Sequence, residues 1–331
     1  APGTLYSSSS LNISQNDHGN DNNKADYFTD ILIFSGTSMA TPLISGLLSL
    51  ISEYFRSGKY LNTPVEPNNG ILKSILIASA SRPDGEIEPD CYIGFGVPDA
   101  SIALPFDNIT NFGMRISEYN KISNATHLKG KINVISSMNK SLIITLCYFD
   151  PPTNYDSLMP ILFDLDLIVK SPSGKIYIGN NRKNNHTEHL SLNEKIVIRS
   201  DEVEDGTYEI HLINNCPQNE LYAFYTISVI GPFENNNQEI NPMFIEMNQT
   251  SECLIQTENG ICDSGLLKCN ENYTGDFCDI PINQINEEGN GYSLEVERND
   301  FSYFKIPKTN YENIMVIVKS DNFKNEYSSV W

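Results

Sequence analysis

The chain has 331 residues, which is enough for about two domains of ordinary size, or for more if some are small. It carries 22 basic and 42 acidic side chains, so its formal net charge is −20 at pH 7. Such an acidic surface repels polyanions, and we therefore expect neither nucleic acid nor an anionic membrane surface as a partner. No apolar run reaches the ~18 residues that a membrane-spanning helix needs, so we expect no membrane span in this segment.

The two ends of the sequence predict an internal piece of a longer protein. The chain begins Ala1-Pro-Gly-Thr-Leu, without an initiating Met, a charged start or a long apolar segment, and it stops at Ser-Ser-Val-Trp331. The start has none of the features of a signal peptide. We therefore expect residues outside this segment to contribute to the activity.

A long helix and a short one are predicted in the first hundred residues. From Ser38 to Phe55, apolar residues recur at spacings of three and four, which indicates a helix buried on most of its circumference. Pro42 is tolerated near a helix start, so this helix should begin close to Ser38. A second apolar helix is expected over 71–80, followed by a polar loop and a turn at Gly94-Phe-Gly96.

Beyond Leu104 the apolar pattern changes to a period of two, which predicts strands. Short alternating runs are separated by turn clusters such as Ser171-Pro-Ser-Gly and Glu204-Asp-Gly. This pattern is typical of an all-β sandwich, which we place at 105–233. The remaining segments are expected to be a linker over 234–252, a small cysteine-rich module over 253–280 and the truncated start of a further β domain over 281–331.

Acceptor triplets for N-linked glycans suit a chain of the secretory pathway, although an Asn-rich composition also produces such triplets by chance. Asn-x-Ser/Thr triplets occur at Asn12, Asn108, Asn124, Asn139, Asn185, Asn248 and Asn272. Together with the cysteines described next, they predict a protein that is secreted, displayed on the cell surface or held in the endomembrane lumen.

Four of the seven cysteines are clustered in the module at 253–280. They are Cys253, Cys262, Cys269 and Cys278. The segment has too few aliphatic residues to fold without crosslinks, and no two of these cysteines have the short spacing of a zinc site, so we expect disulfides. Four cysteines allow three pairings. Cys91, Cys147 and Cys216 remain as buried thiols, or one of them pairs with a part of the protein outside this segment.

The sequence around the four clustered cysteines resembles an EGF-like module. Asn259-Gly-Ile-Cys262 resembles the middle of such a module, and the segment from Cys269 to Cys278 resembles its C-terminal loop. An ordinary module has six cysteines paired first to third, second to fourth and fifth to sixth, and the two absent here correspond to the second and fourth. The resemblance therefore implies the pairs Cys253–Cys262 and Cys269–Cys278.

The most informative motif is Gly36-Thr-Ser-Met-Ala-Thr-Pro42, which is too specific to arise by chance in a chain of this length. It resembles the nucleophile motif of the subtilisin-like serine peptidases, and the resemblance implies that Ser38 is the nucleophile. Ala1-Pro-Gly, the helix at 71–80 and Gly94-Phe-Gly-Val-Pro-Asp-Ala100 resemble flanking parts of the same family. Over 1–104 the resemblance implies the C-terminal part of an α/β, doubly wound peptidase domain.

The residue types at this motif suit acyl transfer. A serine hydroxyl needs a base, usually a His oriented by an Asp, and N–H donors that hold the oxyanion. At a helix N-terminus, Ser38 would lie beside unpaired N–H groups and the positive end of the helix dipole, and its own backbone N–H is a natural oxyanion donor. Gly36 allows a sharp turn and a close approach of substrate, whereas Thr37 and Met39 are expected to be structural.

The other catalytic groups are expected upstream of this segment, because the family places its Asp, its His and its oxyanion Asn before the serine. His18 lies in a loop rich in Asn, Asp and Gly, and we interpret it as a solvated surface residue. The remaining histidines follow the serine in the β region and are also interpreted as surface residues: His127, His186, His189 and His211. The segment alone should therefore hydrolyse nothing.

The β region resembles the jelly-roll domain that follows many subtilisin-like peptidases, including kexin-type convertases. The resemblance rests on Phe149-Asp-Pro-Pro, Asp164-Leu-Asp-Leu-Ile-Val, Ser171-Pro-Ser-Gly-Lys-Ile-Tyr and Asp205-Gly-Thr-Tyr-Glu-Ile. Asp164 and Asp166 should project to one face of a strand, and Leu165, Leu167 and Val169 to the other. Some relatives bind calcium here as a structural ion, but an ordinary solvent face explains the two carboxylates better. We assign no metal ligands and expect no required cofactor.

Two functions fit these observations. The first is a serine endopeptidase that cleaves protein or peptide substrates through an acyl-enzyme on Ser38, with accessory β and EGF-like modules. The alternative is an inactive subtilisin-like scaffold that serves as a secreted or cell-surface binding protein. The intact motif favours the enzyme, and Met39 favours the broad subtilisin group over true kexins.

Overall fold

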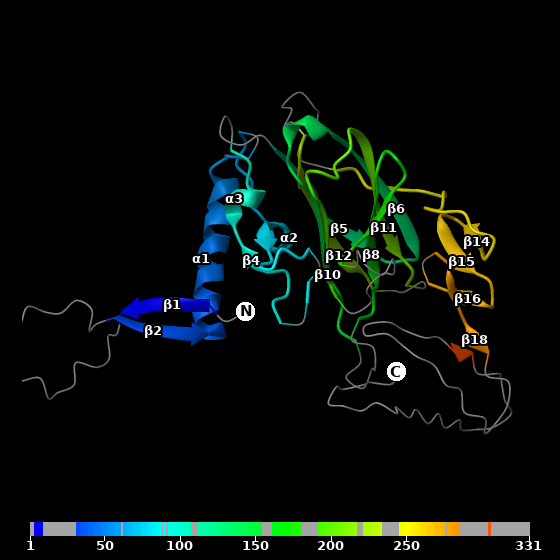
Figure 1. Ribbon diagram of the computed structural model, residues 1–331, viewed down its shortest axis with the longest axis horizontal. Coiled ribbons are helices and arrows are strands. Elements are labelled where there is room, and N and C mark those ends of the chain that lie inside the picture. The colour runs from blue at the N-terminus through cyan, green and yellow to red at the C-terminus, as the bar shows by residue number, and fades with distance from the viewer. Residues whose placement is uncertain are drawn as a thin grey trace, which may run out of the picture.

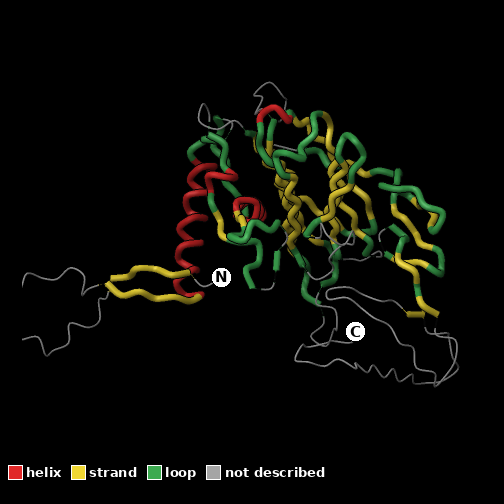
Figure 2. Tube along the Cα trace, viewed as in Figure 1, coloured by secondary structure: helices red, strands yellow, loops and turns green. Residues whose placement is uncertain are grey.

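A computed structural model of the chain describes residues 3–8, 31–60, 62–87, 89–90, 92–106, 112–153, 161–180, 191–216, 221–233, 245–275, 277–284 and 304–305. In these parts the protein is mostly antiparallel β-sheet with few helices (Figure 2). The prediction of a β-rich region is thereby confirmed. These elements do not show the doubly wound α/β architecture expected for 1–104, which stays a prediction.

Two antiparallel sheets pack face to face as a sandwich (Figure 1). The first has the order β10 (Asn193–Ile198), β7 (Leu142–Phe149), β12 (Ala223–Gly231), β5 (Gly113–Ile122). The second has the order β13 (Asn248–Gln249), β6 (Thr126–Val134), β11 (Gly206–Asn214), β8 (Leu165–Lys170), β9 (Ile176–Ile178). Alternate side chains of both sheets, among them Ile144, Leu167 and Tyr208, form one buried core.

The four-stranded sheet is buried on its second face as well, because helices cover it (Figure 1). Helix α2 (Asn69–Ser79) packs on β7 and β12, next to α1 (Thr37–Arg56) and the short α3 (Ala100–Ala103). The side chain of Asn68 caps α2 by accepting the Ile71 N–H at 3.0 Å. The second core joins Ile71 and Ile75 of α2 to Ile143 and Ile230 of the sheet. The helical part and the sandwich therefore share a hydrophobic core.

The long helix begins where Pro42 requires it, at Thr37, but its burial differs from the prediction. Ile51, Tyr54 and Phe55 are buried, whereas Leu43 and Leu50 are 51% and 67% exposed. The expectation of a helix buried on most of its circumference is therefore wrong for 37–50, where no residue is buried. Apolar periodicity identifies the apolar residues of a helix, but their burial depends on the elements packed against them.

Short paired strands complete the helical part. Strand β1 (Gly3–Ser8) pairs antiparallel with β2 (Ile31–Gly36), and Figure 1 shows this hairpin beside the N-terminal end of α1. Strand β3 (Ala80–Ser81) pairs with β4 (Val97–Pro98). Both pairs bring the chain back to a helix end, since β2 leads into α1 and β3 follows α2.

The cysteine module, residues 253–280, contains both disulfides that the resemblance implies, Cys253–Cys262 and Cys269–Cys278. Strand β14 (Gly260–Asp263) forms a hairpin with β15 (Leu266–Cys269), and β16 (Tyr273–Thr274) pairs with β17 (Ile280–Pro281). Strand β18 (Asn283–Gln284) pairs in parallel with β19 (Phe304–Lys305). The rest of the further β domain expected at 281–331 lies outside the described residues.

The segment expected to be a linker over 234–252 is structured in its second half. Ile245 is 6% exposed and belongs to the core of the sandwich. Asn248 and Gln249 form β13, which pairs with Lys129 and Leu128 of β6 and adds an edge strand to the five-stranded sheet. The Asn-rich sequence predicts a connection, but the apolar Ile245 and the open edge of β6 together recruit this part into the sandwich.

Two helical glycines provide a matched test of the packing of α2 on the sheet. A Cβ placed on Gly70 would clash with Thr226 Oγ1 of β12 and lie 3.1 Å from its Cβ, whereas a Cβ on Gly46 of α1 would meet nothing within 4 Å. We expect Gly70→Ala to lower the free energy of unfolding by about 1–3 kcal/mol. Gly46→Ala should raise it by about 1 kcal/mol, because alanine is the better helix former. Urea unfolding of both variants measures this, and equal stability of Gly70→Ala and the natural sequence would contradict the close contact.

Candidate functional site

Ser38 is an exposed residue in the first turn of α1, directly after the strand-to-helix junction. Strand β2 ends at Gly36, and the helix starts at the next residue. Gly36 has φ = 155°, a value that L residues rarely adopt, so glycine allows the chain to turn directly from strand into helix. The sharp junction leaves the Ser38 side chain at the solvent-exposed end of the helix.

The backbone around Ser38 has polar groups without helical partners. The N–H groups of the first turn have no preceding carbonyl to bond to, and no side chain caps them at Gly36. Pro42 is the sixth residue of the helix and has no N–H to donate to the Ser38 carbonyl. In the same turn, Thr41 Oγ1 donates to a different carbonyl, that of Thr37, at 2.9 Å. This end of α1 therefore offers N–H donors to an incoming negative charge.

The histidine and aspartate expected to act with Ser38 are predicted upstream of this segment, and this stays a prediction. The described elements packed on α1 include β1, β2 and α2, and none of these three carries a histidine. His18, His186 and His189 lie outside the described residues. The candidate site that the structure describes is thus the Ser38 hydroxyl and the backbone N–H groups of the first turn of α1.

His127 and His211 are buried, which corrects their interpretation as surface residues. Their exposures are 0% and 2%, and His127 Nε2 lies 2.8 Å from His211 Nδ1. Both side chains point away from the sandwich core, a position that the strand pattern alone assigns to solvent. They are covered because the turn of the β14–β15 hairpin packs over them, with the carbonyl of Gly265 2.9 Å from His127 Nδ1. Burial lowers the pKa of both imidazoles, that of His211 to about 3.

Asp166 is also buried, although we expected it on a solvent face with Asp164. Asp166 is 1% exposed and lies opposite Ile213 of β11, on the same outer face as the buried His211. Leu165, Leu167 and Val169 point into the core, as predicted. Within the residues that the structure describes, no group of three or more His, Cys, Asp or Glu side chains could hold a metal ion.

The described acceptor asparagines are all exposed. They are Asn124, Asn139, Asn248 and Asn272, whereas Asn12, Asn108 and Asn185 lie outside the described residues. Asn139 has φ = 50° at the end of a single helical turn, and Asn248 lies on the edge strand β13. Exposure suits N-linked glycosylation, which stays a prediction.

Two further cysteines are free and buried. Cys147 lies on β7 and Cys216 follows β11, and Cys91 lies outside the described residues. Burial raises the pKa of the Cys147 thiol to about 12, so the reactive thiolate is negligible at neutral pH. Both cysteines occupy the place of small apolar residues.

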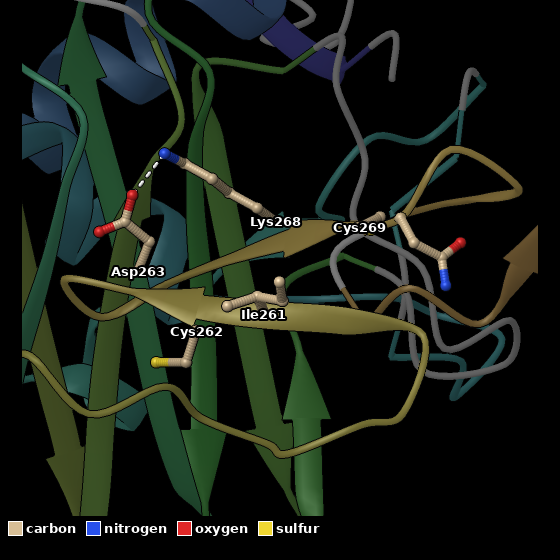
Figure 3. A pocket seen from close by; sticks show the side chains of 6 residues that line it. Ile261, Cys262, Asp263, Lys268 and Cys269 are labelled. Atoms are coloured by element: carbon tan, nitrogen blue, oxygen red, sulfur yellow. Dashed lines mark hydrogen bonds and ion pairs between the residues drawn. The ribbon is translucent and has the colours of Figure 1, made fainter.

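A shallow depression of roughly 400 Å³ lies on the β14–β15 hairpin, with Ile261, Cys262, Asp263, Lys268, Cys269 and Asn270 around it (Figure 3). Asp263 and Lys268 form an ion pair across the hairpin, and Ile261 is 75% exposed. Figure 1 shows this hairpin on the opposite side of the sandwich from α1. The depression is therefore separate from the Ser38 region.

Comparisons with known proteins leave the family of the chain open. No family model matches it, and no curated protein matches it. Among solved structures, the infectious bursal disease virus VP2 subviral particle is 10% identical, with a TM-score of 0.25 over 39% of this chain and 34% of that chain. The Yersinia pseudotuberculosis-derived mitogen is 11% identical, with a TM-score of 0.20 over 39% of this chain and 93% of that chain. The chain thus spans about a third of the first of these structures, and neither likeness carries a functional assignment.

Proposed function

We propose that this chain is the C-terminal part of a subtilisin-like serine endopeptidase in which Ser38 forms the acyl-enzyme. The observation that carries the proposal is the heptapeptide at 36–42, which lies at a strand-to-helix junction with Ser38 exposed in the first turn of a 20-residue helix. Such a junction presents a nucleophile to substrate while the helix fixes its backbone.

In this reaction the Oγ of Ser38 attacks the carbonyl carbon of the scissile peptide bond. Its proton passes to a histidine outside this segment, which then protonates the departing amine. The backbone N–H of Ser38 donates to the oxygen that becomes negative, at the positive end of the α1 dipole. Water subsequently releases the acyl group from Ser38.

The exposed apolar side chains of α1 support a larger catalytic domain. Leu43 and Leu50 lie largely in solvent, and their spacing of seven residues places them on one face of α1. We infer that the upstream part of the peptidase domain covers them. The sandwich would then stabilise the same domain through the core that it shares with α2.

We further propose that the protein acts outside the cytosol. Its two disulfides are typical of an oxidising compartment. Over the described part of the chain, every helix is too short or too polar to cross a membrane. The exposed acceptor asparagines suit the same location.

A serine-directed probe tests the proposal. The full natural protein is treated with a fluorophosphonate, digested and analysed by mass spectrometry, with Ser38→Ala as the control. We expect one adduct, on the peptide that contains Ser38, because only a serine with an assembled base and oxyanion donors reacts rapidly. Folded, fully processed protein without an adduct would overturn the enzyme assignment and favour the binding scaffold.

A further inference from the structure

The two buried histidines join the sandwich to the cysteine module. His127 on β6 and His211 on β11 are hydrogen-bonded to each other, with their ring centres 5.0 Å apart. The second ring nitrogen of His127 faces the carbonyl of Gly265, in the turn of the β14–β15 hairpin. The pair therefore lies at the interface between the sandwich and the cysteine module. None of the described residues of 253–280 belongs to the hydrophobic core of the sandwich.

Further contacts between described residues lie next to the pair, in the segment that leads into the module. The N–H of Thr250 donates to the carbonyl of His127 at 2.9 Å, and β13 pairs with β6 over two residues. Gly265 has φ = +88°, and a Cβ on it would clash with the carbonyl of Thr250 and lie 3.3 Å from His127 Cβ. The hairpin turn thus lies close against His127, and the histidine pair is part of the contact that holds the module there.

The hydrogen bonds define one proton arrangement for the docked state. A carbonyl only accepts, so His127 Nδ1 carries a hydrogen and donates to Gly265. His127 Nε2 then accepts, and His211 Nδ1 must donate to it. In neutral His211 this leaves Nε2 without a hydrogen. A proton on His127 Nε2 would place two N–H groups against each other and break the contact between the rings.

The charged groups around the pair determine how it responds to acid. Glu209 Oε2 lies 3.6 Å from His211 Nε2 and favours a proton there, but Glu209 is itself paired with Lys129 at 3.0 Å. Lys129 and Lys170 disfavour a second positive charge. Glu252 pairs with Lys129 at 3.7 Å, and Asp166 lies on the same face opposite Ile213. The net result, dominated by burial, is a lowered pKa for both imidazoles.

We propose that His127 and His211 form an acid-sensitive latch, which holds the cysteine module against β6 at neutral pH and releases it when the pH falls. In the released state both imidazoles face water and take up protons near their usual pKa of about 6.5. The docked state resists those protons, so acid favours release. Docking is complete above that pH and weakens as the pH falls below it.

The expected change in the release equilibrium with pH follows from proton linkage. Each imidazole that stays neutral when docked but titrates freely when released shifts the release equilibrium by about 30-fold between pH 7.5 and pH 5.0. Thr250 and the strand pair β13–β6 should open with the module, because they lie next to His127. The cores of β7 and β12 should stay closed.

Amide hydrogen exchange on the full chain, corrected for the intrinsic effect of pH, measures this. We expect the peptide with β13 and Thr250 to lose between about 30-fold protection, if one imidazole resists protonation, and about 900-fold, if both do, at pH 5.0, while peptides from β7 and β12 keep theirs. Equal protection of the β13 peptide at both pH values would overturn the latch. Loss of protection throughout the sandwich would overturn it too, because it would indicate global unfolding.

A conservative variant separates titration from packing. In His211→Asn the amide keeps a donor near the position of Nδ1 but does not titrate, so the acid response should fall by at least half on a logarithmic scale. His186→Asn serves as the matched control and should respond as the natural sequence does. An unchanged acid response in His211→Asn would contradict the proposal. If that variant does not fold, NMR titration of the natural protein with ¹³C-labelled histidine tests the latch. Titration of His127 and His211 near pH 6.5 in the docked state would refute the latch.

Discussion

Replacing Ser38 with alanine in the full natural protein should lower kcat for peptide hydrolysis by a factor of about a million, because nucleophile, base and oxyanion donors act as a unit. Loss of Oγ removes the acyl-enzyme route altogether. The substitution is mild for the fold, since Ser38 is exposed and alanine is the better helix former. Release of fluorescent peptides from labelled, unfolded casein measures the effect.

Ser45→Ala is the matched control for that experiment. Ser45 is an exposed serine on the same helix, seven positions further along, so the two variants share their chemistry and their effect on helix propensity. We expect Ser45→Ala to keep the activity of the natural sequence. Equal activity of Ser38→Ala would show that another group performs the hydrolysis, and an inactive natural protein would favour the scaffold.

Local features of this fold follow well from sequence. The start of α1 was predictable because Pro42 excludes a helix that begins much earlier, and Gly36 occupies the one position with φ = 155°. The strands of the sandwich were predictable because alternate residues such as Leu165, Leu167 and Val169 share one face. The position of Ser38 in the first turn of the helix was predictable for the same reason, whereas its role as a nucleophile stays a prediction.

What covers each surface was not predictable from the same patterns. Alternation places His127, His211 and Asp166 on the outer face of the second sheet, but burial of that face depends on elements distant in sequence, including the hairpin turn at Gly265. The same argument explains α1, whose Leu50 is apolar and exposed. The histidine pair follows once the register of β6 against β11 is known. His211 is two residues from Ile213, which is the register partner of His127, so the two imidazoles lie on the same face of neighbouring strands.

The second large effect is expected at Lys195, a buried lysine on strand β10. Its Nζ donates to the carbonyls of Ile77, Ala78 and Ala80 at 3.0, 3.2 and 2.5 Å, so a sheet residue caps the C-terminal end of α2. Lys195→Met keeps an unbranched apolar side chain out to the ε position and removes the Nζ donors. We expect the free energy of unfolding to fall by about 2 kcal/mol, because three carbonyls lose their partner while the buried charge is also removed.

Urea unfolding measures this loss, with Lys131→Met as the control. The Lys131 side chain is 61% exposed on β6, so its replacement should change stability by at most about 0.5 kcal/mol. A Lys195→Met variant as stable as this control would show that α2 is held by apolar packing alone.

The pH dependence of the free energy of unfolding tests whether the amino group of Lys195 is buried in the native state. Burial lowers the pKa of Lys195 to about 8, below its usual 10.5. Between these values the unfolded chain holds a proton that the native amine has released, so native stability rises with pH by up to about 1.4 kcal/mol per unit. Lys195→Met lacks this rise, and the difference between the two proteins should therefore widen from pH 8 to pH 10. A constant difference over that range would mean that burial does not lower the pKa of Lys195 in the native state.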